Sequence, residues 1–193
     1  NLDLKSIKII TSTGSPLAEE SFKYVYENIK QDVHLASIAG GTDLVGCLVL
    51  GNIFSSVYKG EIQGQSLGID VDVFTNGGKS TSSDEKGELV VKQPFPSMPV
   101  KFWGDNDGQK YHKAYFTRFE NIWHHGDFIE RTSNNGFIMR GRSDSTLNPG
   151  GVRIGTSEIY QQVEDIDFIT EGLVVGQDFK DDIRIILFVT TKN

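Results

Sequence analysis

The stretch 141–160 constrains the fold of this chain more than any other, because it is rich in glycine and nearly free of bulky apolar side chains. Three charged residues, Arg142, Asp144 and Arg153, punctuate it. Pro149-Gly150-Gly151 lets the backbone turn sharply and lets a ligand approach closely. By residue type alone, the stretch is typical of a solvated loop between two strands and a helix.

A helix is predicted to begin at the end of this stretch. Thr156 is a suitable N-cap, and Glu158 lies in the first turn, where a negative charge is favourable. One face collects apolar residues spaced i, i+4 and i+7, namely Ile159, Val163 and Ile166. Two strands at 168–175 and 183–190, joined by a turn at 180–182, then indicate the start of a small α+β domain.

The amino-terminal part reads as a strand–helix–strand unit, whose two strands lie at 7–11 and 33–37. The helix between them is expected to begin at Pro16 with Ser15 as its cap. Its buried face is predicted to contain Ala18, Phe22, Val25 and Ile29. Strands joined in this way run parallel.

Two loops of small residues, Gly14-Ser15 and Gly40-Gly41-Thr42-Asp43, follow the carboxyl ends of these strands. In open α/β sheets, ligands bind at that edge. The sequence therefore predicts a ligand crevice there.

Short strands separated by turns dominate the middle of the chain. One pair is expected at 69–75 and 87–92, and a second pair at 128–131 and 137–140. Strands at this spacing suggest a small antiparallel barrel or sheet. The proline-rich segment 94–99 cannot be a central strand, so we expect a fixed surface loop.

Composition excludes several classes of function. A net charge of −7 over 193 residues argues against nucleic acid as a partner. The longest apolar runs, 44–50 and 185–189, are too short to span a bilayer, which argues against a membrane partner. A single cysteine, Cys47, fits a reducing compartment, so a cytoplasmic location is expected, with the thiol a small buried hydrophobe.

The ordered string of residues 141–160 resembles the hinge motif of the adenylate-forming enzymes, the superfamily of acyl-CoA synthetases, peptide-synthetase adenylation domains and luciferases. The resemblance implies a mixed α+β and α/β fold. Residues 1–142 would be the carboxyl-terminal portion of the large domain, with an α/β part at 1–57 and a β-rich part at 58–142. Residues 143–193 would be the hinge, at Asp144, and an incomplete small domain.

The same resemblance assigns roles in nucleotide binding. Residues 39–43 stand where the superfamily keeps a Tyr-Gly-x-Thr-Glu motif, so Gly41 would line the nucleotide, Thr42 would contact the α-phosphate and Asp43 would hold Mg²⁺. Hydroxyl and carboxylate oxygens are ligands that suit magnesium. Ala39 replaces the tyrosine, and Asp43 replaces a glutamate with an arm one methylene shorter, which puts direct metal contact in question.

Three further elements of the nucleotide site follow from the resemblance. Asp127, in His124-His125-Gly126-Asp127, matches the aspartate of the Thr-Gly-Asp motif and would grip the ribose hydroxyls, assisted by Arg142. The residues Gly14, Ser15 and Pro16 would flank the adenine. The run 11–16 also looks like a phosphate loop, but it lacks the closing lysine and further glycines, so the phosphate loop is expected upstream of residue 1.

Several loops resemble a narrower family, the acetoacetyl-CoA synthetases. The resemblance rests on 58–63, 92–99, 123–128 and 145–153. Acetate-activating relatives place a tryptophan at the position of Gly40, so Gly40 would leave room in the acyl pocket for a longer acid. Gly150 and Gly151 would line the pantetheine path, and Arg153 would contact phosphate or help to hold one orientation of the small domain.

The expected function is therefore ATP-dependent activation of acetoacetate to acetoacetyl-CoA through an acyl-adenylate, with ATP, Mg²⁺ and CoA as cofactors. Without a phosphate loop and the lysine that ends the small domain, we expect the chain to be a fragment, inactive by itself. Two alternatives stay open: a synthetase for another short acid, such as propionate or butyrate, and a non-catalytic binding relic of the same fold. The sequence leaves the oligomeric state open.

Overall fold

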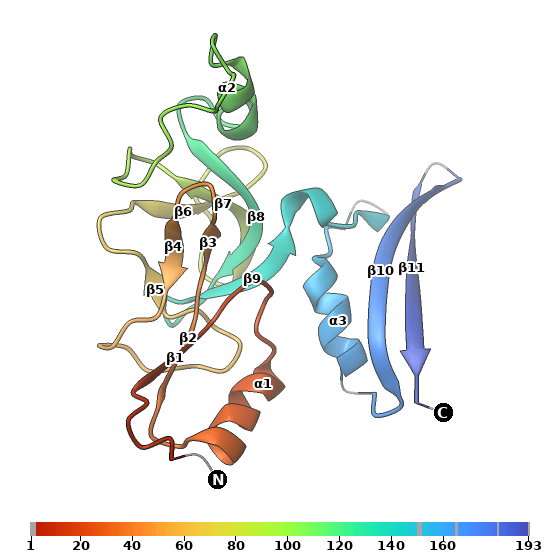
Figure 1. Ribbon diagram of the computed structural model, residues 1–193. Helices are drawn as coiled ribbons and strands as arrows, with labels where there is room; N and C mark the ends of the chain where they lie inside the picture. The colour runs from red at the N-terminus through yellow and green to blue at the C-terminus, as the bar shows by residue number, and fades with distance from the viewer. Residues whose placement is uncertain (1–2, 150–151, 165, 181, 193) are drawn as a thin grey trace. The chain divides into compact units, whose positions relative to one another are not determined.

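The computed structural model describes residues 3–149, 152–164, 166–180 and 182–192. It divides into two compact units, Asn1–Met139 and Arg140–Asn193 (Figure 1). The division falls three residues before the predicted boundary after residue 142. The fold is a mixed α+β arrangement in which strands outnumber helices among the described residues, in line with the expected fold class.

The first unit opens with the predicted strand–helix–strand motif. Strand β1 (Ile9–Ser12) pairs in parallel with β2 (His34–Ser37), with Ile9 opposite His34. Between them lie helix α1 (Glu19–Tyr24) and the π-helix η1 (Val25–Ile29). The parallel pairing confirms the prediction and brings the loops after β1 and β2 to the same edge.

The predicted start of this helix is wrong. Residues 13–18 stay outside the helix, which begins at Glu19 after Ala18, a residue with extended backbone and no side-chain cap. The predicted buried face is only partly correct, since Phe22 is 2% exposed but Ile29 is 41% exposed. The cause is the π-turn, because i→i+5 bonds such as Lys30 N–H to Val25 O rotate later residues off the i, i+4, i+7 face.

Two sheets follow in the first unit. A three-stranded sheet has the order β3-β4-β5 and a four-stranded sheet the order β6-β7-β8-β9, with antiparallel β6–β7 and β7–β8 pairs. The strands are β3 (Ala39–Gly41), β4 (Gly46–Leu50), β5 (Gly64–Gln65), β6 (Val71–Phe74), β7 (Glu85–Val91), β8 (Trp123–Arg131) and β9 (Phe137–Arg142). Both predicted strand pairs are confirmed, and residues 94–99 form a loop as expected.

The sequence did not predict helix α2 (Gln109–Tyr115), which lies between β7 and β8 along the chain. Asp105 explains its start, since the carboxylate accepts hydrogen bonds from the backbone N–H groups of Lys110 (3.1 Å) and Tyr111 (2.8 Å). These donors have no partner inside the helix, so a preceding carboxylate satisfies them. α2 therefore has a fixed start and presents Tyr115, 8% exposed, to the core.

The four-stranded sheet has a different apolar cluster on each face. The larger cluster contains Val91, Leu89, Trp123 and Ile129 from β7 and β8, together with side chains from β4, β6 and α2. The smaller contains Phe74, Val90 and Phe119. Since successive side chains of a strand point to opposite faces, β7 contributes Leu89 and Val91 to the larger cluster and Val90 to the smaller one.

The second unit contains the 3₁₀ turn η2 (Ser143–Ser145), helix α3 (Thr156–Glu164) and the antiparallel hairpin β10 (Ile169–Phe179) and β11 (Asp182–Thr191). α3 and both strands form as predicted, but Thr156 is the first helical residue and not the N-cap, and Ile166, expected on the apolar face, lies beyond the helix and is 36% exposed. The side chain of Glu158 accepts a hydrogen bond from Gly155 N–H at 2.9 Å, which closes the first turn of α3. The turn expected at 180–182 includes Asp181, which lies outside the described residues.

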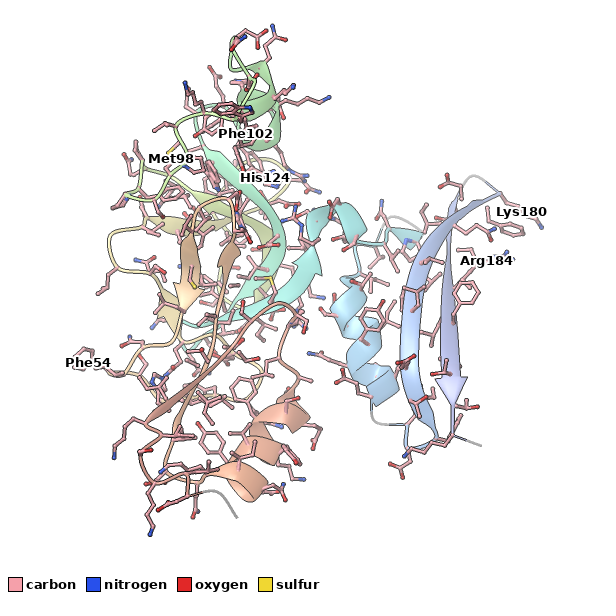
Figure 2. The ribbon with its side chains drawn as sticks, viewed as in Figure 1. Phe54, Met98, Phe102, His124, Lys180 and Arg184 are labelled. Atoms are coloured by element: carbon pink, nitrogen blue, oxygen red, sulfur yellow. The ribbon has the colours of Figure 1, made fainter. Side chains whose placement is uncertain are left out.

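The tip of the hairpin carries two cations against one ring. The guanidinium of Arg184 lies 4.3 Å from the centroid of Phe179, and the ammonium of Lys180 lies 5.2 Å from it (Figure 2). A cation over an aromatic face is attracted by the ring quadrupole, which favours this arrangement of the tip. None of the described helices is long and apolar enough to cross a membrane.

Candidate functional site

The site is organised around the carboxylate of Asp43, in the turn between β3 and β4. Asp43 and Thr42 are both exposed, and the turn reverses the chain through Val45, whose φ is +49°. The hydroxyl of Tyr115 donates a hydrogen bond to Asp43 Oδ2 at 2.5 Å. The predicted magnesium ligand is thus joined to a residue 72 positions away, on α2.

Gly41 is closely packed between this carboxylate and β8. A Cβ placed on Gly41 would collide with Asp43 Oδ1 and would lie 3.1 Å from Cε1 of His125. Any side chain here would push the carboxylate or the imidazole away. The structure therefore gives Gly41 a positional reason to be glycine, beside its predicted place along the nucleotide.

Three rings in series, those of Tyr115, Trp123 and His125, connect Asp43 to the second predicted carboxylate, Asp127. Tyr115 stacks on Trp123 with centroids 3.6 Å apart and planes at 14°, and Trp123 is 2% exposed. The indole N–H of Trp123 faces Nδ1 of His125 at 3.4 Å. Because an indole nitrogen only donates, Nδ1 is the acceptor and the proton of a neutral His125 lies on Nε2.

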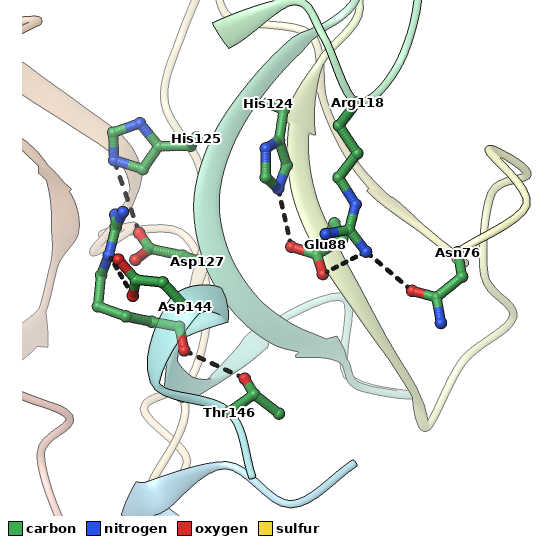
Figure 3. A network of polar contacts seen from close by, with 9 residues as sticks. Asn76, Glu88, Arg118, His124, His125, Asp127, Asp144 and Thr146 are labelled. Atoms are coloured by element: carbon green, nitrogen blue, oxygen red, sulfur yellow. Dashed lines mark hydrogen bonds and ion pairs between the residues drawn. The ribbon is translucent and has the colours of Figure 1, made fainter. Parts of the chain in front are cut away.

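Nε2 of His125 faces the carboxylate of Asp127, with Oδ2 at 3.6 Å (Figure 3). Both residues are 7% exposed. The series Asp43, Tyr115, Trp123, His125 and Asp127 therefore brings two predicted site residues, the magnesium ligand and the ribose ligand, to the ends of one connected group. The sequence predicted these two carboxylates and missed the residues that join them.

A β-bulge presents His125 and Asp127. Glu88 of β7 is opposite Phe128, and Val90 is opposite His124, so three residues of β8 lie where β7 has one. Gly126, in the middle of the three, has φ +84°, a conformation that glycine adopts without strain. A bulge of this kind bends a strand and redirects its side chains, and bulges are frequent beside active sites.

The opposite face of β8 carries a buried polar group. Glu88 has no exposed surface, and its carboxylate contacts Nε2 of His124 (2.9 Å) and the guanidinium of Arg118 (3.1 Å), which also donates to Asn76 (Figure 3). Adjacent histidines therefore have separate partners on separate faces. This explains why two neighbouring histidines occur without forming a metal site.

The predicted adenine loop lies after β1. Gly14 has φ +95° and a hypothetical Cβ would meet no atom within 4 Å, while Ser15 is exposed and Pro16 half-buried. Since β1 and β2 are parallel, this loop and β3 follow strand ends on the same edge. The role of these residues toward adenine stays a prediction.

Gly40 has a packing environment that the sequence did not reveal. A Cβ on Gly40 would collide with the backbone oxygen of Gly46 and would lie 2.6 Å from the Cα of Cys47. The β3–β4 register also shifts between Ala39 and Gly40. The close approach of two backbones is therefore one reason for glycine here, and the predicted role in the acyl pocket stays a prediction.

The predicted hinge residues belong to the second unit. Nε of Arg142 lies 3.6 Å from Oδ1 of Asp144, and both side chains are largely exposed (Figure 3). The hydroxyls of Ser145 and Thr146 donate to the backbone oxygen of Arg142 at 3.0 and 3.1 Å. These bonds fix a tight turn at the predicted pivot.

Two other predicted residues of this unit can be placed only in part. Arg153 is half-buried and precedes Ile154, which pairs with Leu147 in an isolated β-bridge. Gly150 and Gly151, the predicted pantetheine path, lie outside the described residues.

Comparisons with known proteins agree with the resemblance seen in the loops. No protein-family model matches the chain. It is 60% identical over 187 residues to the acetoacetyl-coenzyme A synthetase of Rhizobium meliloti, covering 97% of this chain and 29% of that protein. It is 47% identical to the acetoacetyl-CoA synthetase of Gallus gallus, covering 97% of this chain and 28% of that protein.

Solved structures give the same result. The acetoacetyl-CoA synthetase of Streptomyces lividans matches with a TM-score of 0.86 and 39% identity, over 100% of this chain and 29% of that one. A benzoate CoA ligase of Burkholderia xenovorans matches with a TM-score of 0.76 at 22% identity, over 97% of this chain and 35% of that one, which supports the fold alone. The chain spans less than a third of the length of the Rhizobium meliloti and Gallus gallus relatives.

Proposed function

We propose that this chain, homologous to a segment of the acetoacetyl-CoA synthetases, is part of an AMP-forming acid–thiol ligase that converts acetoacetate, ATP and CoA into acetoacetyl-CoA. The observation that carries the proposal is the 60% identity to the Rhizobium meliloti protein across 97% of this chain. The arrangement of Asp43 and Asp127 in one connected group supports it independently. Asp43 lies in an exposed turn and Asp127 lies in the bulge of β8. These two carboxylates would contact the phosphate-bound magnesium ion and the ribose of one nucleotide.

Asp127 would bind the ribose. Its two oxygens can accept hydrogen bonds from both hydroxyls of a vicinal diol, and His125 holds the carboxylate from one side. Arg142 would assist, and Gly14, Ser15, Pro16 and Gly41 would line the base and phosphates. Each hydrogen bond to a charged group is worth about 1.5–3 kcal/mol, enough to orient the nucleotide.

The residues around Asp43 fit a magnesium ion that ATP brings with it. Thr42 and Asp43 offer a hydroxyl and a carboxylate, both hard oxygen donors, in an exposed turn. Among the described residues, no group of three or more histidine, cysteine, aspartate or glutamate side chains could hold a metal by itself. Mg²⁺ is commonly held by one or two carboxylates together with substrate phosphates, where it stabilises the negative charge of the phosphates.

The chain's own residues would then position two half-reactions. The carboxylate of the acid would attack the α-phosphorus and release pyrophosphate, and Thr42 would donate a hydrogen bond to the α-phosphate as charge develops on it. The thiol of CoA next attacks the acyl carbon of the adenylate, and AMP leaves. A rotation about Asp144 would present a different face of the small domain for this second step, with Gly150 and Gly151 along the pantetheine path and Arg153 on phosphate or holding one orientation.

Cys47 takes no part in this chemistry. Burial raises the pKa of its thiol above the ordinary value, so the reactive thiolate is disfavoured. A single half-buried cysteine is compatible with a reducing compartment, and we propose a cytoplasmic location.

Pyrophosphate release by the whole protein tests the function. Acetoacetate, butyrate, acetate and buffer are compared in parallel with MgATP and CoA present. Turnover with acetoacetate alone supports the proposal, whereas equal turnover with butyrate supports a less selective short-chain synthetase. Absence of turnover with every acid would overturn the ligase and favour a binding relic.

A further inference from the structure

The hydrogen bond between Tyr115 and Asp43 has no counterpart in the roles assigned above. Tyr115 Oη lies 2.5 Å from Asp43 Oδ2. Asp43 sits in an exposed turn, where a carboxylate would otherwise sample several rotamers. The bond uses one of its two oxygens, and the other, Oδ1, lies on the side of Gly41.

Tyr115 is held more firmly than the carboxylate it contacts. Its ring stacks on Trp123 and makes edge contacts with Phe102 and Tyr111, with centroids 5.7 and 5.4 Å away. It is 8% exposed and ends helix α2, whose start Asp105 fixes. Because the ring is confined, the hydroxyl of Tyr115 stays in one place. The hydrogen bond then holds Asp43 Oδ2 beside it.

The requirement for such a donor follows from the length of the side chain at position 43. Aspartate has one methylene fewer than glutamate, so its carboxylate reaches a shorter distance and depends more on its orientation. A hydroxyl that fixes Oδ2 leaves Oδ1 pointing in one direction. Metal-binding carboxylates are commonly oriented by such hydrogen bonds, and loss of the orienting group typically costs about 10- to 100-fold in metal affinity or activity.

We propose that Tyr115 is a positioning residue that orients the Asp43 carboxylate toward the magnesium ion of MgATP. The proposal rests on the proposed function, because it assumes that Asp43 is the magnesium ligand. Tyr115 itself touches neither nucleotide nor metal in this scheme. Its effect passes through Asp43 alone, and that gives the proposal a sharp test.

The test compares the whole wild-type protein with Tyr115→Phe, which keeps the ring and removes the hydroxyl. The dissociation constant of ATP is measured by calorimetry over a series of Mg²⁺ concentrations, without acid or CoA, so that no turnover is required. Tyr115→Phe is expected to raise the Mg²⁺ concentration at half-maximal ATP binding about 10-fold. ATP binding without added metal should stay unchanged.

Tyr111→Phe is the matched control. Tyr111 lies in the same aromatic cluster, and Tyr111→Phe also removes one partly buried hydrogen bond, from the hydroxyl to the backbone oxygen of Pro99 at 2.5 Å. It has no contact with Asp43 among those described. Its Mg²⁺ dependence should match the wild type, which separates the orienting hydroxyl from general packing.

A double-mutant cycle tests whether Tyr115 acts through Asp43. In an Asp43→Asn background, Tyr115→Phe is expected to add nothing, because contacting residues in one network are strongly non-additive. An equal effect in both backgrounds would overturn the proposal, as would a Mg²⁺ dependence of Tyr115→Phe equal to wild type. Tyr115→4-aminophenylalanine restores a hydrogen-bond donor and should restore the wild-type Mg²⁺ dependence. This second variant provides the test if Tyr115→Phe does not fold.

Failure of the function and failure of the inference give different results. A wild-type protein that binds MgATP but releases no pyrophosphate with any acid contradicts the function. A wild-type protein that turns over, paired with a Tyr115→Phe variant of unchanged Mg²⁺ dependence, contradicts only the role of Tyr115.

Discussion

The carboxylate of Glu88, which has no exposed surface, lies 2.9 Å from Nε2 of His124. The second oxygen of Glu88 lies 3.1 Å from the guanidinium of Arg118, which is one-third exposed. A buried carboxylate held by two groups stabilises the fold only while its partners remain, because an uncompensated charge in the interior is costly.

Removing one partner of this network should destabilise the first unit. Glu88→Ala leaves Arg118 and His124 without the carboxylate that they share and opens a cavity, so we expect a loss of about 1–3 kcal/mol in the free energy of unfolding. Glu85→Ala, on the same strand but exposed and bonded only to Ser82 among the contacts described, should cost no more than about 1 kcal/mol. Thermal midpoints of the two variants measure the difference, and equal midpoints would contradict the role of the buried network.

A second buried carboxylate should control stability in acid. Hydrogen bonds from Ser80 and the backbone N–H of Val73, with the ammonium of Lys92, outweigh the opposing effect of burial and hold the pKa of Asp72 below its ordinary value. Its stabilising contribution is therefore complete above the unfolded pKa of about 3.9 and is lost as pH falls through the lower folded pKa.

The measurement for Asp72 is the urea midpoint of wild type and Asp72→Asn at pH 7, 5, 4 and 3. The difference between the two midpoints should be constant from pH 7 to 5 and should narrow below about pH 4, where the carboxyl becomes protonated in the unfolded wild type before it does so in the folded state. Asp107→Asn, at an exposed position, serves as the control and should follow the wild type at every pH. A gap that widens on acidification would show that the sign is wrong.

Gly40 gives a prediction that separates packing from substrate selection. Gly40→Ala places a Cβ against the backbone of Gly46 and Cys47, where no flexible side chain can yield, so a cost of about 1–3 kcal/mol is expected. Gly64→Ala on β5 is the control, since its Cβ would meet no atom within 4 Å. Denaturant titration measures the free energy of unfolding of both variants. A Gly40→Ala variant as stable as Gly64→Ala would contradict the close approach of the two backbones and would leave the acyl pocket as the reason for glycine at this position.

Asp127 should control nucleotide affinity. Asp127→Asn keeps the shape of the side chain but loses the charge and one acceptor, so ATP binding should weaken about 10- to 100-fold. Glu120→Gln, an exposed carboxylate shortly before β8, should bind ATP as the wild type does. Equilibrium dialysis with labelled ATP measures both, and an unchanged affinity of Asp127→Asn would remove Asp127 from the ribose site.

The strands of this fold were predictable because their signal is local. Alternating apolar runs bounded by glycine and asparagine gave β6, β7, β9, β10 and β11 in outline. Helix α1 was predicted to begin too early because Ser15 and Pro16 match a helix start, whereas the backbone stays extended up to Ala18. Its buried face was only partly correct because the periodicity assumed one helical geometry, whereas the chain enters a π-turn at Val25. Helix α2 was missed because it is short, and its capping residue, Asp105, lies in a run of polar residues that reads as a loop.

The candidate site was predictable only at its ends. Asp43 and Asp127 lie in short motifs that a resemblance can match, and their roles stay predictions. The residues between them have no local signal, because Tyr115 meets Asp43 across 72 positions and Trp123 reads as an ordinary core residue. The spacing of Tyr111 and Tyr115, four residues apart, was the one pattern that could have indicated a buried aromatic face on a helix.

The bulge at His125-Gly126-Asp127 makes the sheet less regular but presents two side chains of the candidate site. A β8 shorter by two residues would match β7 one for one and complete the ladder of hydrogen bonds between them. Such a deletion would make a more regular sheet, yet it would discard the histidine and the aspartate that face the aromatic series. Selection for stability alone therefore favours the loss of these residues. A relative that lacks the bulge but keeps the fold is expected to have lost the ability to bind the ligand.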